Sequence, residues 1–313
     1  MLVFRGFCGS RDFFRPAPAP TALGIGNFDG VHLGHQTLLS RIKAAANARS
    51  LNPAVLTFEP HPREFLAPHS APTRLSTLRE KLERIAGQGI ECAYVCRFGA
   101  ALAACPAENF VNDILVDRLR VAHLVVGDDF RFGAQRSGDI ALLRRLGQQH
   151  GFTVETLSGV ACAGKRVSSS LVRQALEGGD MEAAARLLGQ PYAISGRIVP
   201  GRQLGRRLGV PTANIRVKHH RPPLNGVFAV EVDGLPTGRR TGVANLGLRP
   251  SLGGEMAPIL EVHLFDFSGD LYGVHICVRF LHKLRDEQAF ASLDALRQQI
   301  ARDIVSAKHY FSH

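Results

Sequence analysis

The segment GNFDGVHLGHQ (26–36) carries residue types that suit phosphate chemistry. It lies between an apolar run and an amphipathic one, which predicts a turn from a strand into the N-terminus of a helix. Unpaired backbone N–H groups and the helix dipole favour a phosphate there, and the glycines of the segment permit a tight turn. His32 and His35 are three residues apart and share one helix face. Single histidines are more often surface or core residues, but this pair could donate hydrogen bonds as a pyrophosphate leaves.

A second candidate segment, GRIVPGRQLGRRLGVPTANI (196–215), is rich in glycine and arginine. Glycines let a backbone wrap phosphates, and arginines balance their charge, although a solvated basic loop is an equal alternative on charge alone. No Gly-Lys-Ser/Thr follows, so the segment is not a P-loop. Thr212 and Asn214 are two residues apart and face the same way in an extended chain. Their neutral oxygens suit a Mg²⁺ ion that bridges ATP phosphates.

In the first half of the chain, short apolar runs alternate with segments of helical period. The expected strands are 21–26, 53–58, 92–98, 122–127 and 152–157, and the expected helices are 33–48, 77–87, 106–119, 140–151 and 168–180. This alternation predicts a parallel sheet with helices on both faces. Ligands in such folds bind beyond the C-terminal ends of the strands.

The spacing of apolar residues changes after Tyr192, where short strand-like runs are separated by glycine and proline turns. The expected strands are 192–199, 226–234, 241–247, 259–267 and 270–281, followed by a closing helix over 286–307. Such a pattern predicts a small antiparallel barrel or sandwich. We therefore expect two domains, one over 1–185 and the other over 186–313.

Composition agrees with a two-domain globular protein. The chain has 313 residues, 45% hydrophobic and 21% charged, and a formal net charge of +11. That charge attracts anions, which could be nucleic acid, an anionic membrane or phosphorylated small molecules. The six cysteines form no CxxC pair, and no run of about 18 apolar residues predicts a membrane span. We expect a reducing compartment, and hence the cytoplasm, with no membrane partner.

Further strings accompany these two segments and carry a resemblance to a known family. They are TFEPHPREF (57–65), VVGDDFRFGAQRSGD (125–139), RVSSSLVRQAL (166–176), GVANLGLRPSLGG (242–254), LEVHLFDFSGDLYG (260–273) and VRFLHKLRDEQAF (278–290). From Leu23 to about Ala301, the chain resembles the bifunctional riboflavin kinase/FMN adenylyltransferases, the bacterial FAD synthetases. The resemblance implies an α/β nucleotidyltransferase-type (Rossmann-like) parallel sheet domain, then a small antiparallel β-barrel kinase domain with a C-terminal helix.

The resemblance also implies roles for residues of the first domain. Those placed at ATP are Gly26, Asn27, Asp29, His32, His35, Ser169, Ser170 and Arg173, with the two histidines as the catalytic pair. Asp129 would help to hold the flavin, and Ser170 stands where the family usually has Thr. Ser168 could cap a helix instead of binding a ligand. The implied reaction is an in-line attack of an FMN phosphate oxygen on the α-phosphorus of ATP, with Mg²⁺ present.

In the second domain, the resemblance places Gly201, Gly205, Thr212 and Asn214 at ATP and Mg²⁺, and it makes Glu261 the base for the ribityl 5′-hydroxyl. From the residue pattern alone, Glu261 is a solvent-facing residue of a strand. Three positions depart from the family pattern, namely Pro200, Val210 and Ser251. Each departure is expected near nucleotide or flavin, so affinity can change without loss of the base or of the metal-side residues.

Three functions are considered for this sequence. The first is a two-step conversion of riboflavin to FMN and of FMN to FAD, with ATP, riboflavin and FMN as small-molecule partners. The second is FMN adenylylation alone, with a degenerate kinase domain. The third is a basic nucleic-acid-binding protein, which is disfavoured because RNA-binding aromatic patterns are missing and Trp is absent. The sequence leaves the oligomeric state open.

Overall fold

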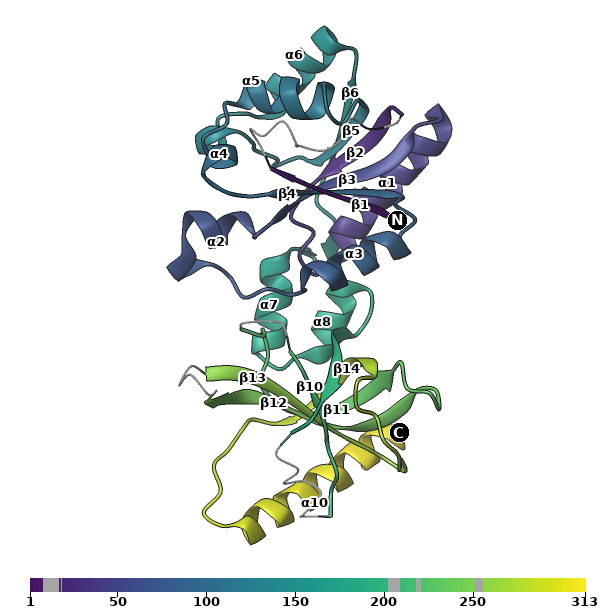
Figure 1. Cartoon of the computed structure of the whole chain (residues 1–313), viewed down its shortest axis with the longest axis vertical. Coiled ribbons are helices and arrows are strands. Elements are labelled where there is room, and N and C mark those ends of the chain that lie inside the picture. Colours follow the sequence, from purple (N-terminus) through teal and green to yellow (C-terminus); the bar gives the residue numbers. More distant parts are fainter. Residues whose placement is uncertain (8–16, 18, 202–208, 218–220, 251–255) are drawn as a thin grey trace. The chain divides into compact units, whose positions relative to one another are not determined.

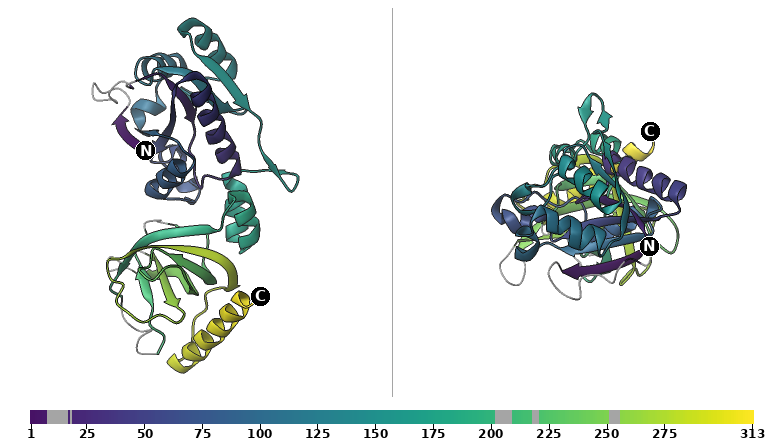
Figure 2. Two further views of the ribbon diagram at one scale, coloured as in Figure 1. Left: turned by 90° about the vertical axis from the view of Figure 1, so that its right-hand side faces the viewer. Right: turned by 90° about the horizontal axis from the view of Figure 1, so that it is seen from above.

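The computed structural model of the chain describes residues 1–7, 17, 19–201, 209–217, 221–250 and 256–313. It divides into two compact units (Figures 1 and 2). The first unit contains Met1–Pro72 and Leu78–Val167, and the second contains Thr73–Thr77 and Ser168–His313. Within the described residues, no helix is both long enough and apolar enough to cross a bilayer.

The first unit is built on a six-stranded sheet whose paired strands are all parallel, in the order β1-β4-β3-β2-β5-β6. Its strands are β1 (Leu2–Phe7), β2 (Thr21–Ile25), β3 (Asn52–Glu59), β4 (Cys92–Arg97), β5 (Val121–Gly127) and β6 (Thr153–Leu157). The parallel sheet confirms the predicted fold class. Strand β1 was not predicted, because Arg5 interrupts its apolar pattern and an edge strand needs only one buried face.

Helices cover both faces of this sheet. The helical segments are α1 (Leu33–Arg49), α2 (Pro62–Leu66), α3 (Leu78–Gly87), α4 (Ala100–Ala103), α5 (Ala107–Asn109), a π-helical segment (Phe110–Val116) and α6 (Ile140–His150). Consecutive residues of β2 point to opposite faces, with Ala22 in the core beneath α1 and Leu23 in the core beneath α6. A Cβ at Gly24 would overlap the Ile42 side chain, so this glycine lets α1 approach β2 closely.

After Thr73–Thr77, the second unit contains α7 (Ser169–Glu177) and α8 (Met181–Leu188), which are followed by a closed barrel. The barrel strands are β9 (Tyr192–Val199), β10 (Ala213–Ile215), β11 (Gly226–Asp233), β12 (Arg240–Pro250), β13 (Met256–Leu264) and β14 (His275–Arg285). They pair antiparallel in the closed order β10-β13-β12-β11-β14-β9. The antiparallel barrel is confirmed, whereas α8 and the short β10 were not predicted.

The closing helix α10 (Leu293–Phe311) packs against β11, β12 and β14. Figure 2 shows it in yellow beside the barrel. The prediction that it begins at residue 286 is wrong. Ser292 is the N-cap, and its side chain accepts a hydrogen bond from the Ala295 N–H. Asp286 and Glu287, which suggested an acidic first turn, instead bond Lys283 and Asn245.

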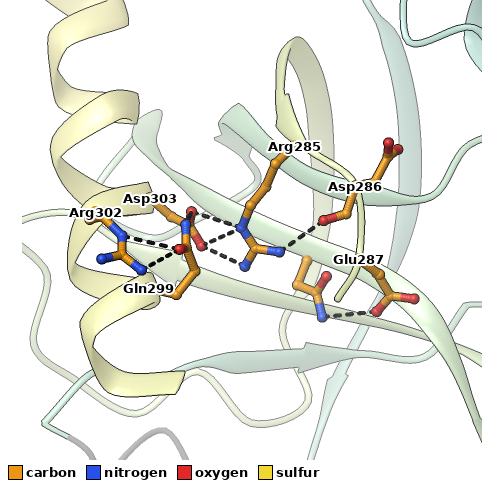
Figure 3. A network of polar contacts seen from close by, with 7 residues as sticks. Arg285, Asp286, Glu287, Gln299, Arg302 and Asp303 are labelled. Carbon is orange, nitrogen blue, oxygen red and sulfur yellow. Dashed lines mark hydrogen bonds and ion pairs between the residues drawn. The ribbon is translucent and has the colours of Figure 1, made fainter. Parts of the chain in front are cut away.

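An ion pair fixes α10 to the barrel (Figure 3). Arg285 of β14 donates from Nε and Nη2 to the Asp303 carboxylate at 2.9 Å and 2.7 Å, and Gln299 adds a further bond at 2.8 Å. Asp303 is 6% exposed, so its charge depends on these donors rather than on water.

Asp303→Ala should lower the free energy of unfolding of the second unit by about 3 kcal/mol, because it leaves the Arg285 guanidinium without its partner. Urea unfolding of the full chain measures this loss. The double variant Arg285→Met/Asp303→Leu should recover much of it, and the exposed Asp294→Ala should change stability by less than about 0.5 kcal/mol. Equal losses for the single and double variants would contradict a pairing role.

Candidate active sites

The turn between β2 and α1 has an unusual backbone. Phe28, Gly30 and Val31 have φ angles of 49°, 82° and 47°, all in the left-handed region. That conformation is costly for an aromatic or β-branched residue. It persists because Phe28 is fully buried and the turn's carbonyls are bonded: Arg84 donates to the Gly30 oxygen at 3.1 Å, and Gln36 to the Val31 oxygen at 2.9 Å.

This turn brings the two predicted histidines together. His32 is the N-cap of α1, and its Nδ1 accepts from the His35 N–H at 3.4 Å. The two rings stack with centroids 3.7 Å apart and an interplanar angle of 17°. Gly34 leaves room for them, because a Cβ there would lie 3.2 Å from the His32 ring, a tight contact. The same turn contains Asp29, which is also buried.

His35 is held in its neutral form. Burial, the neighbouring His32 and the ammonium of Lys81 all lower the pKa of His35 well below 6.5. Its Nδ1 is buried and has no hydrogen-bond partner among the residues that the structure describes. Because Nδ1 of His32 accepts a hydrogen bond, the proton of a neutral His32 lies on Nε2, which can donate to a ligand.

Two groups that the sequence analysis did not single out support this turn. Thr57, at the end of β3, donates from Oγ1 to the Asn27 carbonyl at 3.3 Å. Lys81 of α3 lies with its Nζ 3.5 Å from the same Oγ1 and is 4% exposed. A signal for Lys81 existed, since it shares the apolar face of its helix with Leu78 and Leu82.

Asp129, the predicted flavin residue, follows the C-terminal end of β5. Its side chain is 74% exposed, and Arg166 Nη2 lies 3.3 Å from Asp129 Oδ1 and 2.8 Å from Asp128 Oδ1. Arg166 belongs to β8 (Lys165–Arg166), which pairs with β7 (Ala161–Cys162). The carboxylate therefore lies at the expected edge of the sheet, tethered to a hairpin.

The remaining predicted ATP residues of the first site lie on α7, which belongs to the second compact unit. Ser168 caps this helix by accepting from the Leu171 N–H at 3.2 Å, so the structural alternative for Ser168 is confirmed. Ser169 and Ser170 form the first turn of α7. Arg173 is buried and donates from Nε to the Thr73 carbonyl.

On the barrel, three polar residues of adjacent strands stand in one row. Glu261 of β13 is directly opposite Asn214 of β10 on one side and Asn245 of β12 on the other. The residues that flank Glu261, Leu260 and Val262, are fully buried in the barrel core, so the row lies on the outer face. Opposed residues have Cβ atoms about 5 Å apart, close enough for their polar groups to act together.

Gly201, which follows β9, lies against Asn214 of this row. A Cβ at Gly201 would overlap the Asn214 amide, so only a glycine lets the backbone lie there. Thr212 immediately precedes β10, and His263 Nδ1 lies 2.9 Å from the Pro211 carbonyl oxygen. Gly205 and Ser251 lie outside the described residues.

A second carboxylate borders the row. Asn245 Nδ2 donates to Glu287 Oε1 at 3.4 Å (Figure 3), and a Cβ at Gly247 would fall on the Glu287 carboxylate. Asn245 Oδ1 is buried without a hydrogen-bond partner in the part of the chain that is described. Asn245 was not predicted as a site residue, although an amide inside an otherwise apolar strand is a signal of function.

Comparisons with known proteins match the two parts of the chain to two family models. Residues 15–171 match the family model described as FAD synthetase, and residues 188–311 match the model described as riboflavin kinase. The chain is 48% identical over 289 residues to the bifunctional riboflavin kinase/FMN adenylyltransferase of Escherichia coli (strain K12), covering 92% of both chains. It is 46% identical over 294 residues to that of Pseudomonas fluorescens, covering 94% of each. A crystal structure titled as a macrolide-efflux protein from Streptococcus pneumoniae aligns with a TM-score of 0.81 and 27% identity, over 96% of this chain and 97% of the other.

The low pKa of His35 makes the stability of the first unit depend on pH. The unfolded chain takes up a proton near pH 6.5, whereas folded His35 does not, so acidification favours unfolding. Between pH 7 and pH 5, His35→Gln should lose about 1 to 2 kcal/mol less stability than the wild type. Urea unfolding at both pH values measures this. His123, whose pKa is also lowered by burial, contributes equally to both proteins. Identical pH dependence in the two would contradict a neutral His35.

Proposed function

The chain belongs to the family of bifunctional riboflavin kinase/FMN adenylyltransferases, and from this we propose that it makes FAD in two ATP-dependent steps, one in each domain. The observation that carries the proposal is the match of each half to its own family model, together with a separate polar site in each half. Fold similarity describes architecture alone, so the role of each residue rests on its own chemistry and surroundings. We assign residues 1–185 to adenylylation and 186–313 to phosphorylation.

In adenylylation, an FMN phosphate oxygen attacks the α-phosphorus of ATP, and the bond to the bridging oxygen of pyrophosphate breaks. The N-terminus of α1 and Nε2 of His32 offer donors to the phosphate oxygens, and neutral His35 offers another. Gly26, Asn27 and Asp29 form the turn that aims these donors. No protein nucleophile is needed, because positioning and charge stabilisation supply the rate.

Ser169, Ser170 and Arg173 are proposed to bind the triphosphate. Two hydroxyls in the first turn of a helix and a guanidinium one turn later suit phosphate oxygens. Asp129 is proposed to orient the flavin from the end of β5. These assignments rest on the match to the family pattern and on the residue types.

In phosphorylation, Glu261 accepts the proton of the ribityl 5′-hydroxyl as the oxygen attacks the γ-phosphorus of ATP. Asn214 and Asn245, on either side of it, limit the directions in which the carboxylate can point. Its position in a hydrogen-bonded ladder supports this role, since strand residues are held more firmly than loop residues.

The residues around Asn214 fit a magnesium ion. Thr212 and Asn214 present neutral oxygens, and Gly201 leaves space that a side chain would fill. When bound with ATP, Mg²⁺ would neutralise phosphate charge beside Glu261. A cytoplasmic location is part of the proposal, and it is supported by the five described cysteines, which are all free thiols.

Substitution of one residue in each site separates the two steps. His32→Ala should reduce FAD formation from FMN by about 100-fold or more, because a donor to the transition state is lost, and should leave riboflavin phosphorylation nearly intact. Glu261→Gln should do the reverse. Steady-state assays with riboflavin, ATP and Mg²⁺ measure both products. If either variant lost both activities while remaining folded by circular dichroism, the assignment of one site to each domain would be wrong.

Gly247→Ala should displace the Glu287 carboxylate and free Asn245 from it. We expect riboflavin phosphorylation to fall about tenfold, because small misplacements at a reacting centre are costly. FMN adenylylation in the same preparation provides the control. Gly99→Ala, whose added Cβ meets nothing within 4 Å, should change neither rate. Full kinase activity in Gly247→Ala would exclude a role for the Asn245–Glu287 contact.

A further inference from the structure

Lys81 is a buried lysine that the proposed chemistry of the two sites does not use. It lies on α3 and is 4% exposed. An ammonium loses most of its hydration in such a position, which is costly unless polar groups replace the water. Buried positions on the apolar face of a helix are usually occupied by residues such as leucine. A buried cation at this position therefore suggests a role other than packing.

The contacts of Lys81 lead to the first active site. Its Nζ lies 3.5 Å from Thr57 Oγ1, and the hydroxyl of Thr57 donates to the Asn27 carbonyl at 3.3 Å. The two contacts are compatible, because a hydroxyl can accept from an ammonium while it donates its own proton. One turn further along α3, Arg84 donates directly to the Gly30 carbonyl. Helix α3 thus holds both ends of the left-handed turn.

The charge of Lys81 also reaches the histidine pair. Together with burial and with His32, it lowers the pKa of His35. Charged groups on the surrounding elements include Asp29 in the turn, Glu59 on β3, and Arg79, Glu80, Glu83 and Arg84 on α3. Of these, Asp29 and Glu80 are buried. The positive charge of Lys81 lowers the pKa of His35 and so favours the neutral imidazole.

We propose that Lys81 is a positioning residue for adenylyl transfer: it fixes the Asn27 end of the turn through Thr57 and supplies a buried positive charge beside His32 and His35. The inference rests on the proposed adenylyltransferase function of this site. During the reaction the departing pyrophosphate keeps the electron pair of the broken bond, so its negative charge grows near the turn. A fixed cation in a water-poor setting stabilises that charge without reorganisation.

Full-length variants test this role, with riboflavin phosphorylation by the same chain as an internal control. Lys81→Met keeps the length of the side chain and removes the charge. It should lower kcat for FMN adenylylation about tenfold or more, with a smaller change in KM and less than about twofold change in phosphorylation. Lys81→Arg should retain more activity than Lys81→Met. Lys43→Met, an equivalent change at an exposed lysine of α1 that lies over Gly89, should leave both rates unchanged.

Histidine titration by NMR adds a measurement that a purely structural role would not affect. The His35 signal is identified by its loss in His35→Gln. Its pKa should rise in Lys81→Met and stay low in Lys81→Arg. In Thr57→Val, which breaks the contact but keeps the charge, adenylylation should fall while the pKa of His35 stays low.

The outcomes distinguish this inference from the function on which it rests. Unchanged adenylylation and an unchanged His35 pKa in folded Lys81→Met would overturn the inference, and so would an equal loss of both activities with a lower Tm. In either case, loss of adenylylation in His32→Ala would leave the proposed function standing. If the wild-type chain made no FAD from FMN, the function itself would be wrong.

Discussion

The left-handed backbone before α1 is the constraint on which the first site depends. Phe28 and Val31 adopt a conformation that costs about 1–3 kcal/mol for each residue. In return, the chain enters α1 with His32 at the N-cap, its ring stacked on His35. The cost is offset by groups outside the turn, namely the core around Phe28 and the donors on α1 and α3. The positions of His32 and His35 therefore depend on residues that take no part in the proposed chemistry.

The barrel positions its groups by a different means. Glu261 is fixed by the pairing of β13 with β10 and β12, which places an amide on each side of it. A slip of one residue would turn Glu261 into the core and bring Leu260 or Val262 to the surface, so burial of those neighbours secures the register. A turn in the left-handed region is stabilised by contacts with several side chains. The register of paired strands is instead fixed by the alternation of buried and exposed residues. Buried polar groups occur at both sites: Thr57 supports the turn in the first, and Asn245, whose Oδ1 is buried, stands in the row of the second.

The spacing of apolar residues predicted those helices and strands whose pattern is complete within a short segment. The prediction failed where a contact with a residue distant in sequence determines the structure. The alternation of apolar runs with segments of helical period predicted the parallel sheet. The closely spaced strand-like runs after Tyr192 predicted the barrel. Strand β1 was missed because Arg5 breaks an apolar run that tertiary pairing with β4 tolerates. The start of α10 was placed at residue 286 because Asp286 and Glu287 resemble a first turn, whereas both are used by Lys283 and Asn245. The histidine pair was visible in a single string. Lys81 and Asn245 carried weaker signals, because the contacts that give them a role join elements distant in sequence.

The two sites face the same electrostatic problem and answer it with different groups. In the first, burial, the neighbouring His32 and the charge of Lys81 lower the pKa of His35, so His35 would act as a hydrogen-bond donor that adds no permanent charge. Two fully charged imidazoles would bind ATP and pyrophosphate alike, and uniform binding of that kind does not lower the barrier and slows release. In the second, the row on the barrel offers oxygens and a carboxylate, which alone would repel phosphates. That donor set suits a divalent cation. Under the proposed function, the barrel would use a divalent cation to balance phosphate charge, whereas the first domain would use a helix terminus and a buried lysine.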